Sequence, residues 1–72
     1  MDAGKTGKLI SERRKAIKLT QKELADKLHI TDKAVSKWER GLSFPDISIL
    51  IPLAEILNIS LYDLLKGGND NE

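Results

Sequence analysis

Helix-start signals recur at short intervals along this 72-residue chain, and they restrict its fold more than any other feature of the sequence. Thr20 and Glu23 have the spacing of a capping box, in which the hydroxyl accepts from an orphan amide and the carboxylate reaches back to the helix start. Residues with similar capping ability stand at Thr31, Asp46 and Ser60. Strand signals are weak, because few runs of β-branched residues alternate with polar ones. The sequence therefore predicts an all-α fold.

Five helices are expected in one compact domain. The first spans roughly Lys8–Lys18 on its apolar periodicity, and the second begins near Gln21. The third follows the Thr31 cap for about nine residues, and Gly41 is placed to end it in a left-handed conformation. The fifth follows Ser60.

The fourth helix contains one discordant residue. It follows Asp46, and its buried side is expected to hold the apolar residues Ile47, Leu50, Ile51, Ala54 and Leu57. Pro52 lies inside this helix, lacks a backbone donor and clashes with the preceding turn. We therefore expect a kink or an irregular first turn.

Length and composition exclude several classes of protein. A chain this short buries only about 60% of the surface that its unfolded form exposes, so a large catalytic cleft is not expected. It has no cysteine for a disulfide or a thiolate metal site, and no apolar run near the roughly 20 residues that cross a bilayer. The N-terminus lacks the apolar segment of a signal peptide, so we expect a soluble, cytoplasmic protein. Residues 8–66 form the expected domain, between a flexible N-terminus at 1–7 and a flexible tail at 67–72.

Charge divides the chain into two halves. Residues 1–40 hold eleven Lys/Arg and six Asp/Glu, a net charge of +5, whereas residues 41–72 hold one lysine and five acids, a net charge of −4. This asymmetry favours a first half that faces a polyanion and a second half that faces solvent or another chain. Ordinary solvated helix faces are the alternative.

The helix that follows Thr31 has two different sides. Long cations and short hydrogen-bonding side chains fall along one side, namely Asp32, Lys33, Ser36, Lys37 and Arg40. The opposite side carries Ala34, Val35 and Trp38, and we expect Trp38 to pack in the core rather than stack on bases. With only His29 and Ile30 between Leu28 and the Thr31 cap, this helix must cross the preceding one steeply, which exposes its N-terminal end beyond the domain surface.

The segment Leu19–Gly41, "LTQKELADKLHITDKAVSKWERG", resembles the helix-turn-helix of the lambda repressor and Cro-like (XRE) family of transcriptional regulators. Ala25 matches the small residue of the second helix, and Val35 and Trp38 match the apolar positions of the third. With "LAEILNISLYDLL" the similarity covers about residues 8–66 and implies the five-helix, lambda-repressor-like DNA-binding fold, with the motif at helices two and three. His29 departs from the pattern, because the family usually has glycine there; histidine is among the residues enriched at positive φ.

The resemblance also implies a set of DNA-binding residues. Gln21 would contact a phosphate, and Asp32, Lys33, Ser36 and Lys37 would lie in the major groove. A lysine there can bond guanine, whereas Asp32 has two open roles, accepting from cytosine or strengthening the N-terminus of its helix. The remaining members of the set, expected at or near the DNA backbone, are Lys22, Thr31, Arg40 and Ser43.

One ion pair is expected to be structural. Glu39 falls near the packing side of its helix, where an unpaired carboxylate would be unfavourable. In the family an arginine of the first helix pairs with it, and Arg14 stands at that position, with Arg13 as the next candidate. A bidentate pair would lock the first helix against the third.

The expected function is sequence-specific binding of double-stranded DNA that regulates transcription as a repressor. One small module contacts few base pairs, so a homodimer on a palindromic operator is expected, and Phe44, Leu61 or Tyr62 could form its contact or simply the rim of the core. The alternative is an antitoxin-like protein-interaction module that retains the fold. With His29 as the only histidine, we expect no enzyme activity, no catalytic residue and no metal, and the sequence indicates no cofactor or small-molecule ligand.

Overall fold

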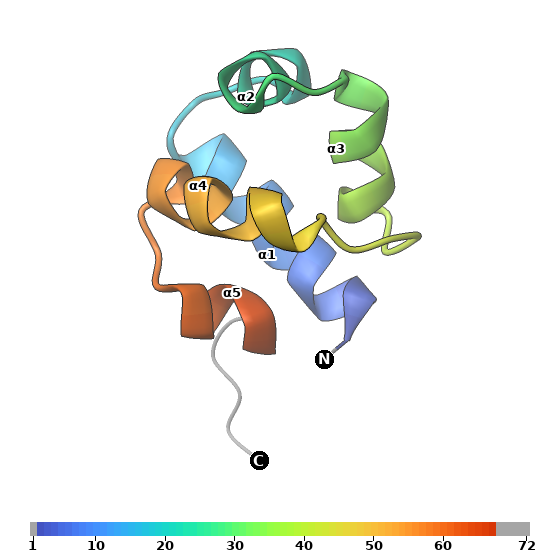
Figure 1. The fold of residues 1–72 in the computed structure, drawn as a ribbon, viewed down its shortest axis with the longest axis vertical. Coiled ribbons are helices and arrows are strands. Elements are labelled where there is room, and N and C mark those ends of the chain that lie inside the picture. Colours follow the sequence, from blue (N-terminus) through green and yellow to red (C-terminus); the bar gives the residue numbers. More distant parts are fainter. Residues whose placement is uncertain (1, 68–72) are drawn as a thin grey trace.

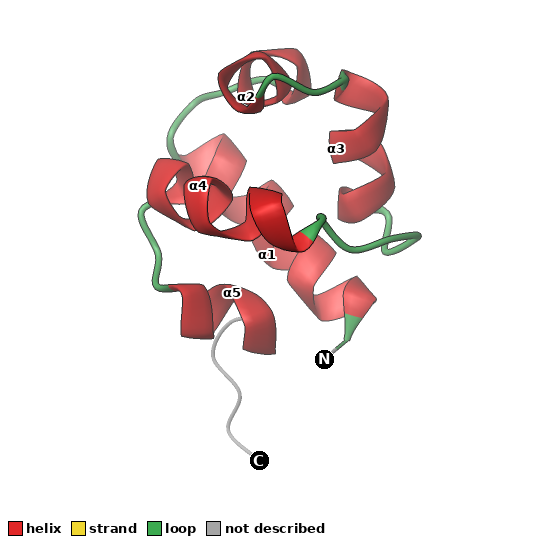
Figure 2. Ribbon diagram, in the orientation of Figure 1, coloured by secondary structure: helices red, strands yellow, loops and turns green. Residues whose placement is uncertain are grey.

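A computed structural model describes residues 2–67, and this part of the chain forms five α-helices (Figures 1 and 2). The helices are α1 (Ala3–Ala16), α2 (Gln21–Leu28), α3 (Asp32–Glu39), α4 (Ile47–Leu57) and α5 (Leu61–Lys66). No strand occurs within residues 2–67, so the predicted all-α fold is confirmed. None of the helices in this part of the chain has the length and apolar character needed to cross a membrane.

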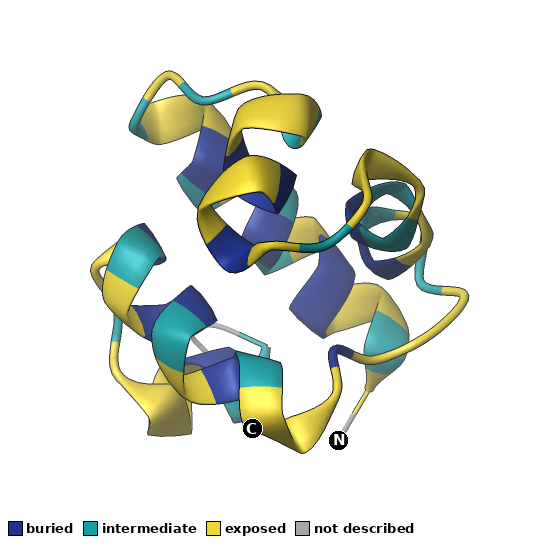
Figure 3. Ribbon diagram, turned by 45° about the horizontal axis from the view of Figure 1, so that its top comes forward, coloured by how far each residue is buried: buried dark blue, intermediate teal, exposed yellow. Residues whose placement is uncertain are grey.

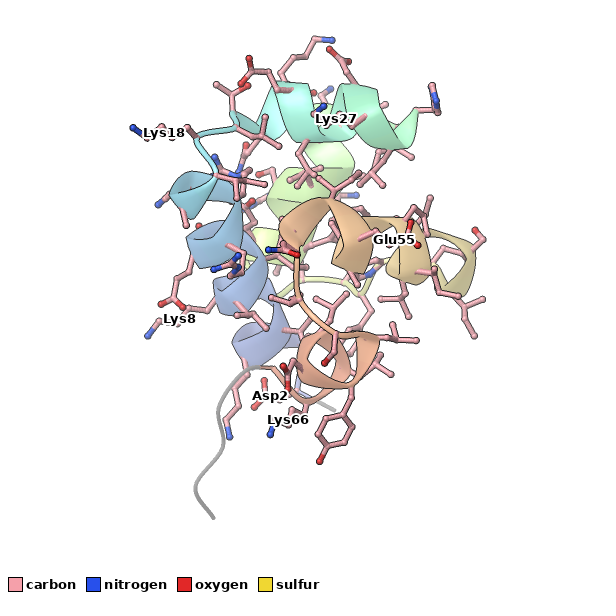
Figure 4. The ribbon with its side chains drawn as sticks, turned by 90° about the vertical axis from the view of Figure 1, so that its left-hand side faces the viewer. Asp2, Lys8, Lys18, Lys27, Glu55 and Lys66 are labelled. Atoms are coloured by element: carbon pink, nitrogen blue, oxygen red, sulfur yellow. The ribbon has the colours of Figure 1, made fainter. Side chains whose placement is uncertain are left out.

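α1 is the central support of the domain. It packs against α3, α4 and α5, while α2 packs on α3 and α4. In Figure 1, α2 lies at the top of the molecule and α3 at its upper right, both away from α5 near the bottom. α1 begins and α5 ends at the same opposite end, where Figure 4 shows Asp2 and Lys66. The pair formed by α2 and α3 therefore projects from a base made by the other helices.

The start of α1 differs from the prediction. The helix begins at Ala3 rather than near Lys8, and Asp2 caps it by accepting from the amides of Gly4 and Lys5 at 2.8 and 3.1 Å. Thr6 and Gly7 are buried, so residues 3–7 belong to the packed domain, whereas the prediction placed the start of the domain at residue 8. Thr6 and Gly7 pack closely because they are small, and apolar periodicity does not detect such positions. The predicted flexible tail lies outside the described residues except for Gly67, which ends α5 with φ 80°.

The core draws on all five helices. It contains the buried residues Ile10, Leu24, Ala25, Leu28, Val35, Trp38, Leu50, Leu53, Ala54, Leu57 and Leu64. Figure 3 shows these inward sides as buried and the outward sides as exposed. Trp38 lies in this core, as its spacing with Val35 predicts.

The buried side of α4 is only partly as predicted. Leu50, Ala54 and Leu57 are buried as expected, but Ile47 and Ile51 are 81% and 57% exposed. Leu53 takes their place in the core. Because α4 is apolar on nearly every side, periodicity alone does not select the face that packs. The helix runs through Pro52 without a break, and a kink there stays a prediction.

Two turns of the domain share one backbone design. The turn between α2 and α3 has His29 at φ 58° and ψ 41°, and the turn between α4 and α5 has Asn58 at φ 59° and ψ 45°. In each, the isoleucine that follows donates its amide to an alanine carbonyl of the preceding helix, Ile30 to Ala25 at 3.0 Å and Ile59 to Ala54 at 3.1 Å. We refer to α2–α3 as the first pair and to α4–α5 as the second pair.

Candidate nucleic-acid interface

The outward side of α3 is the candidate interface. Thr31 caps the helix, because its hydroxyl accepts from the amide of Ala34 at 3.2 Å. Asp32, Lys33 and Lys37 are exposed, whereas Val35 is fully buried on the opposite side. The division of α3 into a packing side and an outward polar side is therefore as the sequence predicts.

Ser36 on α3 is hydrogen-bonded to Arg40, the residue that follows the helix. The Nε of Arg40 donates to the Ser36 hydroxyl at 3.2 Å and to the Ser36 carbonyl at 3.3 Å. Arg40 thus folds back along its own helix, and its guanidinium extends the basic surface that begins with Lys33 and Lys37. Ser43 is exposed in the segment that joins α3 to α4, after Gly41 at φ 74°.

The N-terminus of α2 lies beside this surface and is firmly capped. Glu23 donates its amide to the Thr20 hydroxyl at 3.0 Å, and the Glu23 carboxylate accepts from the Thr20 amide at 2.8 Å, which confirms the capping box. Lys22 donates to the Asp26 carboxylate at 2.9 Å. Both of these side chains are mostly exposed, and such surface pairs contribute little to stability, so Lys22 remains available to a phosphate.

The predicted ion pair between α1 and α3 is confirmed. Arg14 donates from Nε and Nη2 to the two carboxylate oxygens of Glu39 at 2.7 and 3.0 Å, and from Nη1 to the Leu19 carbonyl at 2.7 Å. The two charged side chains are only 10% and 7% exposed. Arg13, the other candidate, instead donates to the Leu57 carbonyl at the end of α4. Arg14 is therefore structural, since it fixes α3 on α1.

The contacts between Arg14 and Glu39 favour the charged form of both side chains. Burial by itself would raise the pKa of the Glu39 carboxyl, but hydrogen bonds from Arg14 and Gln21 outweigh it, and the pKa lies below the usual 4.5. The hydrogen bond to Glu39 likewise raises the pKa of Arg14. A carboxyl with a lowered pKa stabilises the fold above its ordinary pKa, and this contribution is lost as the pH falls through the folded-state pKa.

Gln21 is placed differently from the expectation of a side chain open to a phosphate. Its Nε2 donates to Glu39 Oε1 at 3.0 Å, and the side chain is partly buried. The sequence did not predict this bond, because Gln21 and Glu39 are 18 residues apart and only the crossing of α2 and α3 brings them together. Within residues 2–67, no group of three or more His, Cys, Asp or Glu side chains could hold a metal ion.

Residues 10–64 match the protein family described as Helix-turn-helix. The chain belongs to this helix-turn-helix family. Its five-helix fold is similar to the crystal structure of the P22 c2 repressor in complex with a synthetic operator, with a TM-score of 0.82 and 35% identity. That similarity covers 86% of this chain and 94% of the P22 chain, and it confirms the predicted repressor-like fold.

Two curated relatives of this helix-turn-helix chain are named as transcriptional regulators. The uncharacterised HTH-type transcriptional regulator YqaE of Bacillus subtilis (strain 168) is 46% identical over 59 residues, which are 82% of this chain and 51% of YqaE. The HTH-type transcriptional regulator DicA of Escherichia coli (strain K12) is 41% identical over 66 residues, which are 92% of this chain and 49% of DicA. The chain thus spans about half the length of these relatives.

Proposed function

We propose that this domain binds double-stranded DNA sequence-specifically and represses transcription in the cytoplasm. The observation that carries this proposal is the outward side of α3, whose exposed Lys33 and Lys37 are held away from the core by the buried Val35 and Trp38. The similarity to a repressor that was crystallised with an operator supports it.

The dimensions of α3 suit the major groove. An α-helix with its side chains is about 10–12 Å in diameter, which matches the roughly 12 Å width of the major groove in B-DNA. Lys33 and Lys37 can donate to guanine O6 and N7, and Ser36 can pair with several bases. Asp32 either accepts from cytosine N4 or stabilises the N-terminus of α3.

A second set of residues is proposed to contact the DNA backbone. Gln21 opens α2, so its backbone amide and side-chain amide can both donate to a phosphate beside the positive end of that helix. The rest of this set is Lys22, Thr31, Arg40 and Ser43, all exposed. Such contacts set the register of the protein on the duplex and carry no base preference of their own.

Two copies are proposed to occupy a palindromic operator, with half-sites about one helical turn apart. The exposed Phe44, Leu61 and Tyr62 are candidates for the contact between copies, together with Ile47 and Ile51, which the packing of α4 leaves in solvent. Sedimentation with and without duplex would test this, and a single copy bound at saturation would exclude the dimer.

The test begins with selection of bound sequences from a random duplex pool, followed by titration of the selected duplex at several salt concentrations. The variant that carries both Lys33→Ala and Lys37→Ala should bind at least about 100-fold more weakly while it folds normally. A plot of the logarithm of the association constant against the logarithm of the salt concentration has a negative slope. If both lysines contact phosphates as well as bases, the variant's slope should be less steep by about 1.8. Failure of the wild-type chain to retain any duplex in dilute buffer would contradict the proposal.

A protein-interaction module is the second candidate, favoured by the exposed apolar side chains of the acidic second half of the chain. If the domain is a protein-interaction module, alanine at Lys33 and Lys37 should leave its binding to a partner protein unchanged. The two-lysine variant therefore separates the candidates.

A further inference from the structure

We infer that Glu39 is a positioning residue that fixes the side-chain amide of Gln21 for a contact with DNA. This inference rests on the proposed function, in which Gln21 faces a phosphate. A chain of hydrogen bonds joins three helices, from Arg14 on α1 through Glu39 at the end of α3 to Gln21 at the start of α2.

Every link of this chain is short. Arg14 holds both oxygens of the Glu39 carboxylate at 2.7 and 3.0 Å and is itself tied to the Leu19 carbonyl at 2.7 Å. Glu39 then accepts from Gln21 Nε2 at 3.0 Å through Oε1, the oxygen that Arg14 Nη2 also contacts. Because the arginine is fixed at two places, the carboxylate has one position, and Gln21 is bonded to a fixed acceptor.

The chemistry of the acceptor decides which way the amide turns. A glutamine amide has an oxygen that accepts and a nitrogen that donates two hydrogens, and the two ends have nearly the same shape. An ionised carboxylate accepts only, so the opposite orientation of Gln21 would place two oxygens against each other. Glu39 therefore selects the orientation in which the nitrogen of Gln21 faces it.

The selected orientation suits a phosphate. One hydrogen of Nε2 goes to Glu39, and the second points in a different direction from the same nitrogen. Phosphate oxygens also accept only, so this second hydrogen is the group that a DNA backbone requires. Since the side chain is ordered before DNA arrives, less side-chain freedom is lost on binding.

Arg14 makes this arrangement compatible with DNA. A free carboxylate beside a phosphate would repel it, whereas the bidentate arginine neutralises Glu39 inside the domain. The pair that fixes α3 on α1 thus has a second role, because it also presents the first residue of α2.

Gln21 is the only glutamine of the sequence, so labelling with 15N-glutamine gives a single pair of side-chain amide hydrogens in a nuclear magnetic resonance spectrum. In the free protein, one hydrogen should exchange slowly with water and the other quickly. Addition of the selected duplex should slow the exchange of the second hydrogen as well. Equal, fast exchange of both hydrogens in the free protein would overturn the inference, as would a second hydrogen that the duplex leaves unchanged.

Variants test the same inference through affinity, each corrected for its folded fraction. Gln21→Ala should weaken binding about tenfold at every salt concentration, because a neutral amide releases no counterion. Glu39→Gln should weaken binding by a similar factor, and the two changes together should weaken it little more than either alone. Normal affinity of folded Glu39→Gln would overturn the inference. If the wild-type chain binds no duplex, the proposed function itself has failed.

Discussion

The first pair and the second pair of helices have the same turn but different surfaces. Four of eight residues are identical between "LADKLHIT" (24–31) and "LAEILNIS" (53–60), and each segment ends in a hydroxyl side chain that caps the next helix. Beyond the cap, the first pair continues with Asp32 and Lys33, whereas the second continues with Leu61 and Tyr62. All four side chains are exposed.

This difference shows that the turn and the surface are set by separate residues. The left-handed residue, the isoleucine after it and the capping hydroxyl are common to the turns of both pairs. The residues on the outward side of the following helix then decide what it can bind. In the first pair that side is basic and polar, and in the second it is largely apolar.

Both pairs rest on neighbouring residues of α1. Gly7 lies against α3 so closely that an added Cβ would be 1.9 Å from the Trp38 carbonyl oxygen. Thr6 lies against α5, where its hydroxyl donates to the Leu64 carbonyl at 3.2 Å. One turn of α1 thus supports the last turn of α3 on one side and α5 on the other.

Replacement of Gly7 should break the support of the first pair and have the largest effect. Gly7→Ala forces a methyl group into the Trp38 backbone, which cannot move aside, so the free energy of unfolding should fall by about 3 kcal/mol. Urea unfolding measures this loss. Gly4→Ala is the matched control, because its methyl group would meet only the Asp2 side chain, and its stability should stay the same or rise slightly. Equal stability of the two variants would show that α1 and α3 are not in close contact.

Lysines at equivalent places in the two pairs should differ in their effect on DNA. Lys37 and Lys66 each stand eight residues after the left-handed residue of their turn. Lys37→Ala should weaken binding of the selected duplex about tenfold, or about 1.4 kcal/mol, and Lys66→Ala should leave it unchanged. Fluorescence anisotropy titration gives both values. Equal losses would mean that net charge, rather than the surface of α3, determines binding.

Loss of the Thr6 hydroxyl should loosen only the second pair. Thr6→Val keeps the shape of the side chain and leaves the Leu64 carbonyl without its donor, so stability should fall by about 1 kcal/mol. Thermal unfolding measures this change, and DNA affinity measured well below the transition should stay the same. An affinity loss of tenfold or more would show that α5 takes part in binding.

The smallest effects are expected at the left-handed residue of each helix pair's turn. His29→Gly and Asn58→Gly each relieve a positive φ, but glycine also increases the freedom of the unfolded chain. Each variant should change stability by only about 0.5 kcal/mol, with a larger gain at His29 because asparagine tolerates this conformation better. A large loss at either site, measured by urea unfolding, would mean that the side chain itself holds the turn.

Most of the fold follows from local signals in the sequence. Thr20, Thr31, Asp46 and Ser60 cap the helices that they were predicted to cap, because a cap depends on residues close together in the chain. Apolar periodicity did not predict the helix at residues 3–7, since it is held by the fit of Thr6 and Gly7 against distant helices.

In the candidate site, too, local signals in the sequence do not predict contacts between distant residues. The outward side of α3 and the pair between Arg14 and Glu39 were predicted, the first from helical periodicity and the second from the family resemblance. The bond between Gln21 and Glu39 was not, because it depends on the angle at which α2 and α3 cross.

Backbone amide shifts, measured while the 15N-labelled chain is titrated with the selected duplex, compare the two pairs of helices in one spectrum. We expect large shifts at Lys33, Ser36 and Lys37 and at the start of α2, with little change at the equivalent Tyr62, Leu65 and Lys66. Shifts concentrated in α5, or none in α3 at saturating duplex, would contradict the claim that the outward side of α3 enters the groove.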